Sequence, residues 1–259
     1  MTPAKDRCCR EPRPADCPPR KPLDCPPGIA PFGGPASGLW PSGSSFGQVS
    51  LSSCLGANLF SECFQGCNNP GNCGWQTIFG NVVFTGQSVL LDPNGTAAVI
   101  FKPFSGVPPS NVTLQARFQE MTGSIEPTMQ YAVGAIGSTG RGIVAVQLRG
   151  DGLVTVEIGE MTDYTGTWTP QGNGAFHTVV VTVAPNGTPS LFIDQTFIPL
   201  VVGGAPAPAP FGPGIIFSVV NFGGTAQGPA TLFSIFLARG IYPPTTVFCC
   251  PNGQPPPQV

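Results

Sequence analysis

The chain has 259 residues, a formal net charge of −2 at pH 7, 35 Gly, 32 Pro and 10 Cys. Charged residues make up only 9% of it, and it contains a single His. A chain so poor in Lys and Arg is unsuited to nucleic-acid binding, which requires clustered cations to neutralise phosphates. One imidazole also excludes a zinc centre built from several histidines.

Charge is distributed unevenly along the chain. Ten of the charged residues lie within residues 1–25. The remaining body has little charge repulsion to keep copies apart, and its surface must consist mainly of neutral polar groups. Such a surface tolerates self-association, so a second copy of the chain is an expected partner.

The cysteine content indicates an oxidising compartment, because cysteine-rich chains without catalytic or metal spacing usually carry disulfides. The first 25 residues contain no apolar segment of the kind found in a secretory signal, so no signal peptide is visible. No stretch approaches the ~18 consecutive apolar residues that would span a bilayer. We expect a protein without a membrane span that is extracellular or exposed on a cell, spore or virion surface.

Residues 1–53 are predicted to form a flexible arm rich in Pro, Gly and Cys. The unit Asp-Cys-Pro-Pro occurs at residues 16–19 and again at 24–27. Closely spaced prolines favour extended polyproline conformations and interfere with regular strand pairing. The repeat would hold Cys17 and Cys25, two further disulfide candidates, on a semi-rigid spacer.

Two vicinal cysteine pairs lie towards the two ends, Cys8-Cys9 in the arm and Cys249-Cys250 in a Pro-rich tail of residues 243–259. Adjacent cysteines rarely bond each other, because a trans peptide separates their side chains and a bonded pair stores strain. Each thiol therefore needs a partner elsewhere. We predict that all four form intermolecular disulfides. The alternative is that the two tails bond each other within one chain.

Residues 54–73 form a cysteine cluster. We expect two local disulfides that cap one end of the following domain, and a short helix within Leu55–Gln65. The alternative is a zinc site, although zinc ribbons and fingers usually offer two close Cys-x-x-Cys pairs, which this cluster lacks. The four disulfide candidates are Cys54, Cys63, Cys67 and Cys73.

Residues 74–242 have the pattern of an all-β domain. The segment 112–118 alternates apolar with polar residues, which is typical of a half-buried strand. The turn sequence Gly150-Asp151-Gly152 separates two more alternating segments and predicts a hairpin. About a dozen short antiparallel strands predict a two-sheet jelly-roll sandwich. The other strands are expected at 80–85, 97–102, 129–136, 177–183, 190–194, 215–221 and 231–238.

Two of these strands carry a family resemblance. The segment Phe176-His177-Thr178-Val179-Val180-Val181-Thr182, the turn Pro185-Asn186-Gly187 and the segment Leu191-Phe192-Ile193-Asp194 follow one another. This order resembles the laminin-G-like, concanavalin A-like jelly roll, whose members often read Trp-His-His-Val-Ala-Val-Thr, a turn, and Leu-Tyr-Val-Asp-Gly. Here Phe176 replaces the usual Trp and Gln195 the usual Gly.

The resemblance implies a sandwich that binds glycans or proteins, sometimes with calcium. Calcium could be held by Asp151, Asp163 or backbone carbonyls. No acidic loop with regular ligand spacing is present, however. We therefore expect no cofactor.

Some sandwiches of this class are glycoside hydrolases with paired carboxylates on one strand. Glu157 and Glu160 are three residues apart, so on a regular strand their side chains point to opposite faces. The sole histidine, His177, opens a predicted strand, where a structural role bonded to the backbone is favoured over that of a catalytic base. The sequence thus predicts a protein that is not an enzyme.

Glycan binding would use aromatic rings on loops, because the apolar face of a sugar stacks on a flat ring. The best cluster is Asp163, Tyr164 and Trp168, which lies between two predicted strands. The alternative for Trp168 is a structural one, in which the ring folds back over the edge of the sandwich.

Two functions compete, and the weak charge, the proline-rich arm and the terminal cysteine pairs favour the first. In the first, the chain is a structural or assembly protein of a fibre, spore or virion surface, cross-linked by its cysteine-bearing tails. In the second, it is a lectin-like module for a carbohydrate or protein ligand, and its disulfides serve only stability.

Overall fold

The computed structural model describes residues 54–56, 58–120, 127–138, 142–159, 162–172, 174–203, 212–222, 229–253 and 256. The predictions for the arm, including those for Cys8, Cys9, Cys17 and Cys25, lie outside the described residues. Within the described ranges, the only helix is the short 3-10 turn η1 (Gly71–Cys73), and no helix could span a membrane.

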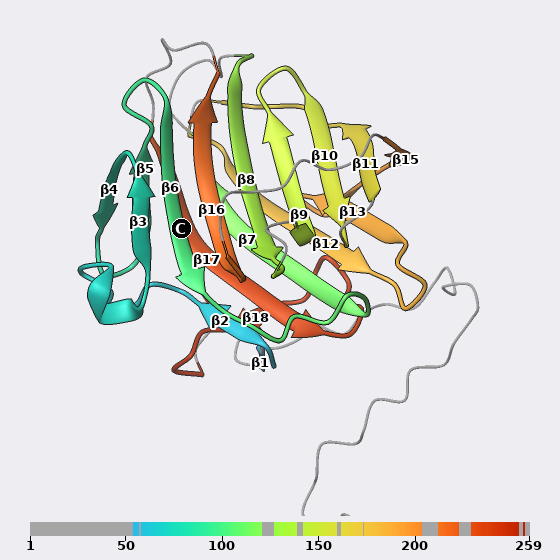
Figure 1. Cartoon of the computed structure of the whole chain (residues 1–259), viewed down its shortest axis with the longest axis horizontal. Coiled ribbons are helices and arrows are strands. Elements are labelled where there is room, and N and C mark those ends of the chain that lie inside the picture. Colours follow the sequence, from blue (N-terminus) through green and yellow to red (C-terminus); the bar gives the residue numbers. More distant parts are fainter. Residues whose placement is uncertain are drawn as a thin grey trace, which may run out of the picture. The chain divides into compact units, whose positions relative to one another are not determined.

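Two antiparallel sheets pack face to face (Figure 1). The front sheet, which lies towards the viewer in Figure 1, has eight strands. In spatial order they are β15 (Val201–Val202), β11 (Thr162–Thr167), β10 (Leu153–Ile158), β9 (Gly142–Arg149), β8 (Met129–Ile136), β16 (Gly214–Asn221), β6 (Ala97–Pro103) and β3 (Gln76–Phe79).

The back sheet also has eight strands, one of which, β2 (Phe60–Glu62), pairs with β17 beside the main path. The others are, in order, β14 (Thr196–Ile198), β13 (Pro189–Ile193), β12 (Phe176–Val183), β7 (Val112–Gln119), β17 (Ala230–Arg239), β5 (Val89–Asp92) and β4 (Asn81–Phe84). A separate parallel pair joins β1 (Leu55–Gly56) to β18 (Phe248–Cys249).

The hydrophobic core lies between the sheets because the strands alternate. Along β7, Val112, Leu114, Ala116 and Phe118 are all buried in the main core cluster. The ring of Phe118 lies 5.2 Å from that of Tyr131 on β8 of the front sheet, measured between centroids. Such close aromatic contacts join the two layers into one core.

The predicted sandwich and its main strands are confirmed. Strand β8 spans Met129–Ile136 as predicted, and the hairpin at Gly150-Asp151-Gly152 joins β9 to β10. The predicted helix within Leu55–Gln65 is wrong, because β2 pairs with β17 through Glu62 and Ile235. The segment that holds Asp163 and Tyr164 forms an additional strand, β11, and is not a loop.

After β17 the chain returns across the outer face of the back sheet. We call residues 240–253 the C-terminal strap. The ring of Phe248 stacks on that of Phe236 at 5.5 Å, and Gln115 Nε2 donates a hydrogen bond to the Thr246 carbonyl oxygen at 3.1 Å. Part of the outer face of the back sheet is therefore a second, smaller apolar contact zone.

Candidate functional site

Two carboxylates lie side by side on the outer face of the front sheet. Strands β10 and β11 pair so that Glu157 is directly opposite Asp163, while Val156 is opposite Tyr164. Because side chains alternate between faces, the two acids share the outer face and Tyr164 packs towards the core. Directly opposite residues have Cβ atoms about 4.5–5.5 Å apart, so the two side chains leave the sheet as neighbours.

A chain of amides leads to this acid pair from the next two strands. Gln130 Nε2 on β8 donates to Gln147 Oε1 on β9 at 3.3 Å. Gln147 Nε2 in turn donates to Glu157 Oε1 at 2.9 Å. The amide of Gln147 therefore fixes the position of the Glu157 carboxyl group.

Asp163 has a different environment from its neighbour. Burial raises the pKa of its carboxyl group. Its Oδ1 atom is buried and accepts no hydrogen bond from the described residues. The pair therefore places Glu157, which accepts the amide of Gln147, beside a carboxyl group that is more readily protonated, and this combination can both accept and donate hydrogen bonds.

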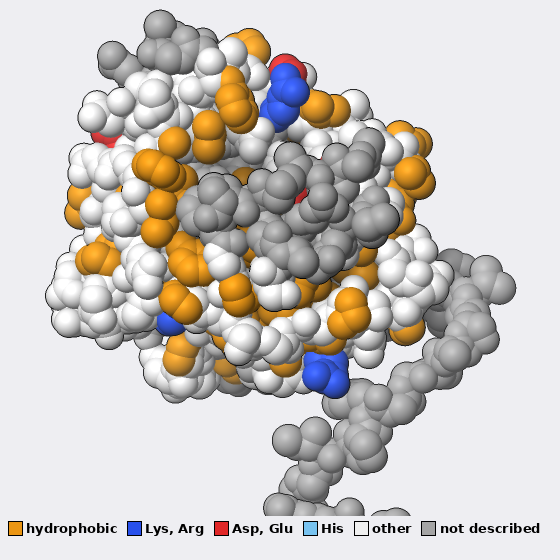
Figure 2. Space-filling model, in the orientation of Figure 1, with side chains coloured by type: hydrophobic (Ala, Val, Ile, Leu, Met, Phe, Trp, Pro, Cys, Tyr) orange, Lys and Arg blue, Asp and Glu red, His pale blue; other side chains and the backbone are white. Residues whose placement is uncertain are grey.

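Small residues continue the same row across the front sheet. Ala145 lies opposite Glu157, Gly134 opposite Ala145, and Ile216 opposite Gly134. A Cβ atom on Gly134 would approach that of Ala145 to 2.5 Å, so a larger residue does not fit there. The row thus passes from two acids over small residues to an apolar side chain, and Glu157, Ala145 and Ile216 within it are only 8%, 6% and 8% exposed. Figure 2, drawn from the same side, has many apolar and few charged side chains.

The predicted ligand residues have separate locations. Asp163 is on the outer face and stays a prediction. The prediction is wrong for Trp168, which is only 6% exposed and donates its indole N–H to the Arg149 carbonyl oxygen at 2.8 Å. The alternative, in which Trp168 folds back over the sandwich, is confirmed. Tyr164 packs against the core and cannot act as an exposed platform.

Sequence reasoning missed Gln130, Gln147 and the partner of Glu157. Strand alternation could have assigned Gln147 and Glu157 to the outer face. The pairing of Glu157 with Asp163 had no such signal, because β11 contains too few apolar residues to be predicted as a strand.

The single histidine lies in a buried network at the end of the back sheet. His177 Nδ1 contacts Asp194 Oδ2 at 2.5 Å, and Nε2 forms a salt bridge to Glu120 Oε1 at 3.1 Å. The other Glu120 oxygen accepts a hydrogen bond from the Gly172 N–H. Burial lowers the pKa of His177, but the hydrogen bonds and negative charges of Asp194 and Glu120 outweigh it and raise the pKa to about 9.

His177 is therefore an imidazolium at neutral pH, with a carboxylate at each ring nitrogen. A protonated ring cannot accept a proton, which agrees with the structural role predicted for it. Its expected bond to the backbone is wrong, because both partners are carboxylates.

Three disulfides form among the described cysteines. Cys54 bonds to Cys249, Cys63 to Cys250, and Cys67 to Cys73. The prediction that Cys249 and Cys250 form intermolecular bridges is wrong, because the strap returns over the back sheet and brings both to the cysteine cluster. Of the two local disulfides expected within the cluster, only Cys67–Cys73 forms. The zinc alternative is wrong, because all four cysteines of the cluster are bonded in disulfides.

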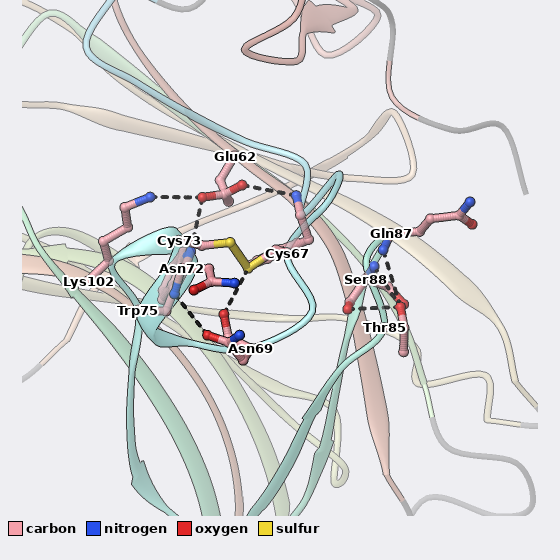
Figure 3. Close-up of a disulfide and its surroundings, with 11 residues drawn as sticks. Glu62, Cys67, Asn69, Asn72, Cys73, Trp75, Thr85, Gln87, Ser88 and Lys102 are labelled. Atoms are coloured by element: carbon pink, nitrogen blue, oxygen red, sulfur yellow. Dashed lines mark hydrogen bonds and ion pairs between the residues drawn. A yellow bond between two sulfur atoms is a disulfide. The ribbon is translucent and has the colours of Figure 1, made fainter.

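A buried charge supports the cluster (Figure 3). Glu62 Oε2 accepts hydrogen bonds from the indole N–H of Trp75 at 3.0 Å and from Lys102 Nζ at 2.9 Å. Its Oε1 accepts the backbone N–H of Phe64 at 3.0 Å. Three donors satisfy the carboxylate, so this acid is an internal anchor of the cysteine cluster.

The expectation of no cofactor, with calcium as the open possibility, stays a prediction. Within the part of the chain that the structure describes, no three His, Cys, Asp or Glu residues are grouped to hold a metal ion. Of the two predicted acids, Asp151 pairs with Arg149 at 2.5 Å, and Asp163 faces Glu157 on the front sheet.

No family model and no curated protein matches the sequence. Solved structures with a similar fold include a carbohydrate esterase from Shiga toxin-encoding bacteriophage phi24B, at 14% identity and a TM-score of 0.51, covering 72% of this chain and 100% of that one. A glycoside hydrolase family protein from Mycobacterium thermorestibile has 15% identity and a TM-score of 0.50, covering 69% and 99%. The metal-free carbohydrate recognition domain of Emp46p has 14% identity and a TM-score of 0.47, covering 66% and 90%.

The first two likenesses support the class of fold, which is a two-sheet jelly-roll sandwich. They also correct the expectation that the chain is not an enzyme, because proteins with this fold include a glycoside hydrolase and a carbohydrate esterase. The sequence argument considered only Glu157 and Glu160 on one strand. It overlooked Asp163, which the adjacent strand brings opposite Glu157. Glu160 lies outside the described residues.

Proposed function

We propose that the chain is a lectin-like carbohydrate-binding module whose glycan site is the outer face of the front sheet. One observation carries the proposal: Glu157 and Asp163 lie opposite each other, with Gln147 bonded to Glu157. A sugar presents several adjacent hydroxyl groups, each of which donates and accepts hydrogen bonds. Carboxylates and amides in one row match that pattern.

The row also has an apolar end. Beyond Ala145 and Gly134 lies Ile216, which is followed by Phe101 on β6. A pyranose has polar edges and an apolar face. A site with acids at one end and apolar side chains at the other suits both.

The test is glycan retention by the full chain and by amide variants. Glu157→Gln and Asp163→Asn keep the shapes of the side chains but remove the charges. We expect each to weaken retention on a glycan array at least tenfold, with an unchanged melting temperature. Asp151→Asn, the same chemical change at the exposed hairpin of the same sheet, is the matched control. Equal retention by all four proteins would exclude this site.

The same acid pair supports glycoside hydrolysis as a second candidate function. Retaining glycosidases use two carboxyl groups about 5–5.5 Å apart, one of them with a raised pKa as the acid. Burial raises the pKa of Asp163, and Gln147 donates a hydrogen bond to Glu157. Release of reducing ends from β-glucans that disappears in both amide variants would support it. Glycan retention without release of reducing ends would support binding and exclude hydrolysis.

Two finer assignments are also proposed. The first is kinship with laminin-G-like domains, supported by the order of β12, its turn and β13. A sequence profile built from new homologues would test it.

The second is an assembly role at an extracellular or virion-like surface. With Cys249 and Cys250 bonded within the chain, cross-linking would rest on the cysteines of the arm. A gel without reductant would show multimers that the double change Cys8→Ser and Cys9→Ser removes.

A further inference from the structure

The molecule carries an exposed apolar patch where the chain passes from one sheet to the other. Strand β14 ends the back sheet, and after a two-residue link the chain enters β15, which ends the front sheet on the right in Figure 1. We call residues 196–203 the apolar edge. Phe197, Val201 and Val202 in it are 55%, 66% and 72% exposed. Three of the nine large exposed apolar side chains of the described residues thus lie within six positions, and such clustering marks an interaction site.

The two valines lack cover from the back sheet. Val202 lies opposite Tyr164, whose side chain packs towards the core, so Val202 points to the same side of the front sheet. Because Val202 is nevertheless exposed, the back sheet does not reach over β15. Val201 points to the outer side and is exposed as well. An apolar strand is therefore open on both faces at this end of the front sheet.

Two aromatic rings continue the patch onto the back sheet. Phe197 on β14 lies opposite Phe192 on β13, and their ring centroids are 5.6 Å apart. The neighbours of Phe192 on β13, Leu191 and Ile193, are buried in the core, so both rings point to the outer face. The apolar edge and Phe192 therefore form an apolar surface that spans both sheets.

The backbone of the apolar edge is also open on one side. Among the described residues, β14 pairs only with β13, and β15 only with β11. Such edge strands expose unpaired N–H and C=O groups, and proteins usually protect them with charged side chains or β-bulges. Strand β3, at the opposite end of the front sheet, has an irregularity of this kind between Thr77 and Phe79. The pairings of β14 and β15 are regular, and residues 195–238 contain no Asp, Glu, Lys or Arg.

The absence of charge determines which partner fits. A partner with charged side chains at the contact would bury them without counter-ions, which is unfavourable. The partner must instead be apolar, uncharged and able to add a strand. A second copy of the apolar edge meets these requirements, because a two-fold axis brings identical residues together in antiparallel strands. Repulsion between copies is weak, since the whole chain has a net charge of only −2.

We propose that the apolar edge is a homodimer interface, in which the β15 strands of two copies pair about a two-fold axis and Phe197 packs against the partner. The front sheets of the two copies then continue into each other. This contact differs from assembly through the arm, because it needs no intermolecular disulfide. Both strands are short and few large side chains contribute. The buried area is therefore below the roughly 800 Å² per partner of a standard interface, and we expect a dimer that dissociates at micromolar concentrations.

Sedimentation velocity of the full chain tests this interface over concentrations of about 1–300 µM. A background with the four cysteines of the arm replaced by serine excludes covalent dimers through the arm. We expect the fraction of dimer in this background to rise with concentration. Val202→Lys and Phe197→Lys each place a charge in the contact at an exposed position. Each should weaken the dimer at least tenfold, with an unchanged melting temperature.

Val83→Lys is the matched control. Val83 is 45% exposed on β4, which ends the back sheet on the side away from β14. This variant should dimerise like the background. Glu157→Gln should also dimerise normally, so failure of the front-sheet glycan site does not affect the result.

A cysteine cross-link tests the two-fold arrangement. The axis brings residue 201 of one copy close to residue 201 of the other, so mild oxidation should cross-link the dimers of Val201→Cys. Val83→Cys should not cross-link under the same conditions. A monomer at every concentration, equal dimerisation by Val202→Lys and Val83→Lys, or a dimer without the Val201→Cys cross-link would overturn the proposal.

Discussion

At the scale of single residues, buried charge is the feature that most constrains this nearly uncharged body. His177 is the clearest case, because its imidazolium lies between Glu120 and Asp194 and is only 1% exposed. The ring also touches the core, at 5.3 Å from the centroid of Trp168. The network ties the end of β7, the start of β12 and the turn after β13 together.

The stability of the fold should therefore fall at alkaline pH. The pKa of His177 is raised from 6.5 to about 9, so the folded state holds the proton more tightly than the unfolded state. Its contribution is fully present below pH 6.5 and is lost as the pH rises through 9. The shift corresponds to a free energy of unfolding on the order of 3 kcal/mol.

Urea unfolding at pH values between 6 and 10 measures this contribution. His177→Gln should be less stable at pH 6 and should show a flatter pH dependence over the same window. If the free energy of unfolding of the variant falls equally steeply with pH, another group is responsible.

Glu62 gives a second residue-scale prediction. Glu62→Gln replaces a charged acceptor of three hydrogen bonds by an amide whose N–H₂ meets other donors, so it should cost about 1–3 kcal/mol. Lys102→Met should cost less, because Glu62 keeps the Trp75 and Phe64 donors and the lysine side chain is already 26% exposed. The urea unfolding midpoints of the two variants measure the difference in their stability. A larger loss in Lys102→Met would contradict the view that the hydrogen bonds outweigh the salt bridge.

At the scale of elements, the C-terminal strap depends on two disulfides that close nearly the same long loop. Cys54–Cys249 spans 195 residues and Cys63–Cys250 spans 187. When one bridge is present, the other closes only a short additional loop. Removing either pair should therefore cost about 2–3 kcal/mol.

Removing both pairs releases the long loop and should cost more than the sum of the single losses. Serine replacements of each pair and of both, unfolded in guanidinium without reductant, measure the three free energies. The Cys67–Cys73 pair, with a separation of only 6, is a control whose loss should add independently. If the two single losses of stability add up to the loss in the double variant, the view that the two long disulfides close nearly the same loop is contradicted.

At the scale of the whole molecule, period-2 alternation was sufficient to predict most strands. It located β7, β8, β9, β10, β12, β16 and β17 within a residue or two, because each buries one face in the core. It missed the short strands β1, β2, β3, β5, β14, β15 and β18 as well as β11. The burial pattern of β11 contains no fully buried residue, and β2 is only three residues long and is held by its partner β17.

The candidate sites were less accessible to sequence reasoning than the fold. Asp163 was predicted from its proximity to two aromatic residues, but both rings turn inward, and the important neighbour is Glu157 on the next strand. The apolar edge is continuous in sequence, but its exposure depends on β14 and β15 being the outermost strands of the two sheets. No local pattern shows which strands end a sheet.

The sequence by itself determined the layered β architecture and the need for disulfides, because alternation and cysteine content are local properties of the chain. Only the tertiary structure decided which cysteines pair, which acids face each other and which strands end each sheet. Cys249 illustrates the difference, since its partner lies 195 residues away. The ring of Phe248 packs against that of Phe236 on the outer face of β17, and this contact holds the strap close to Cys54. Such long-range contacts are selected by packing, and local patterns do not encode them.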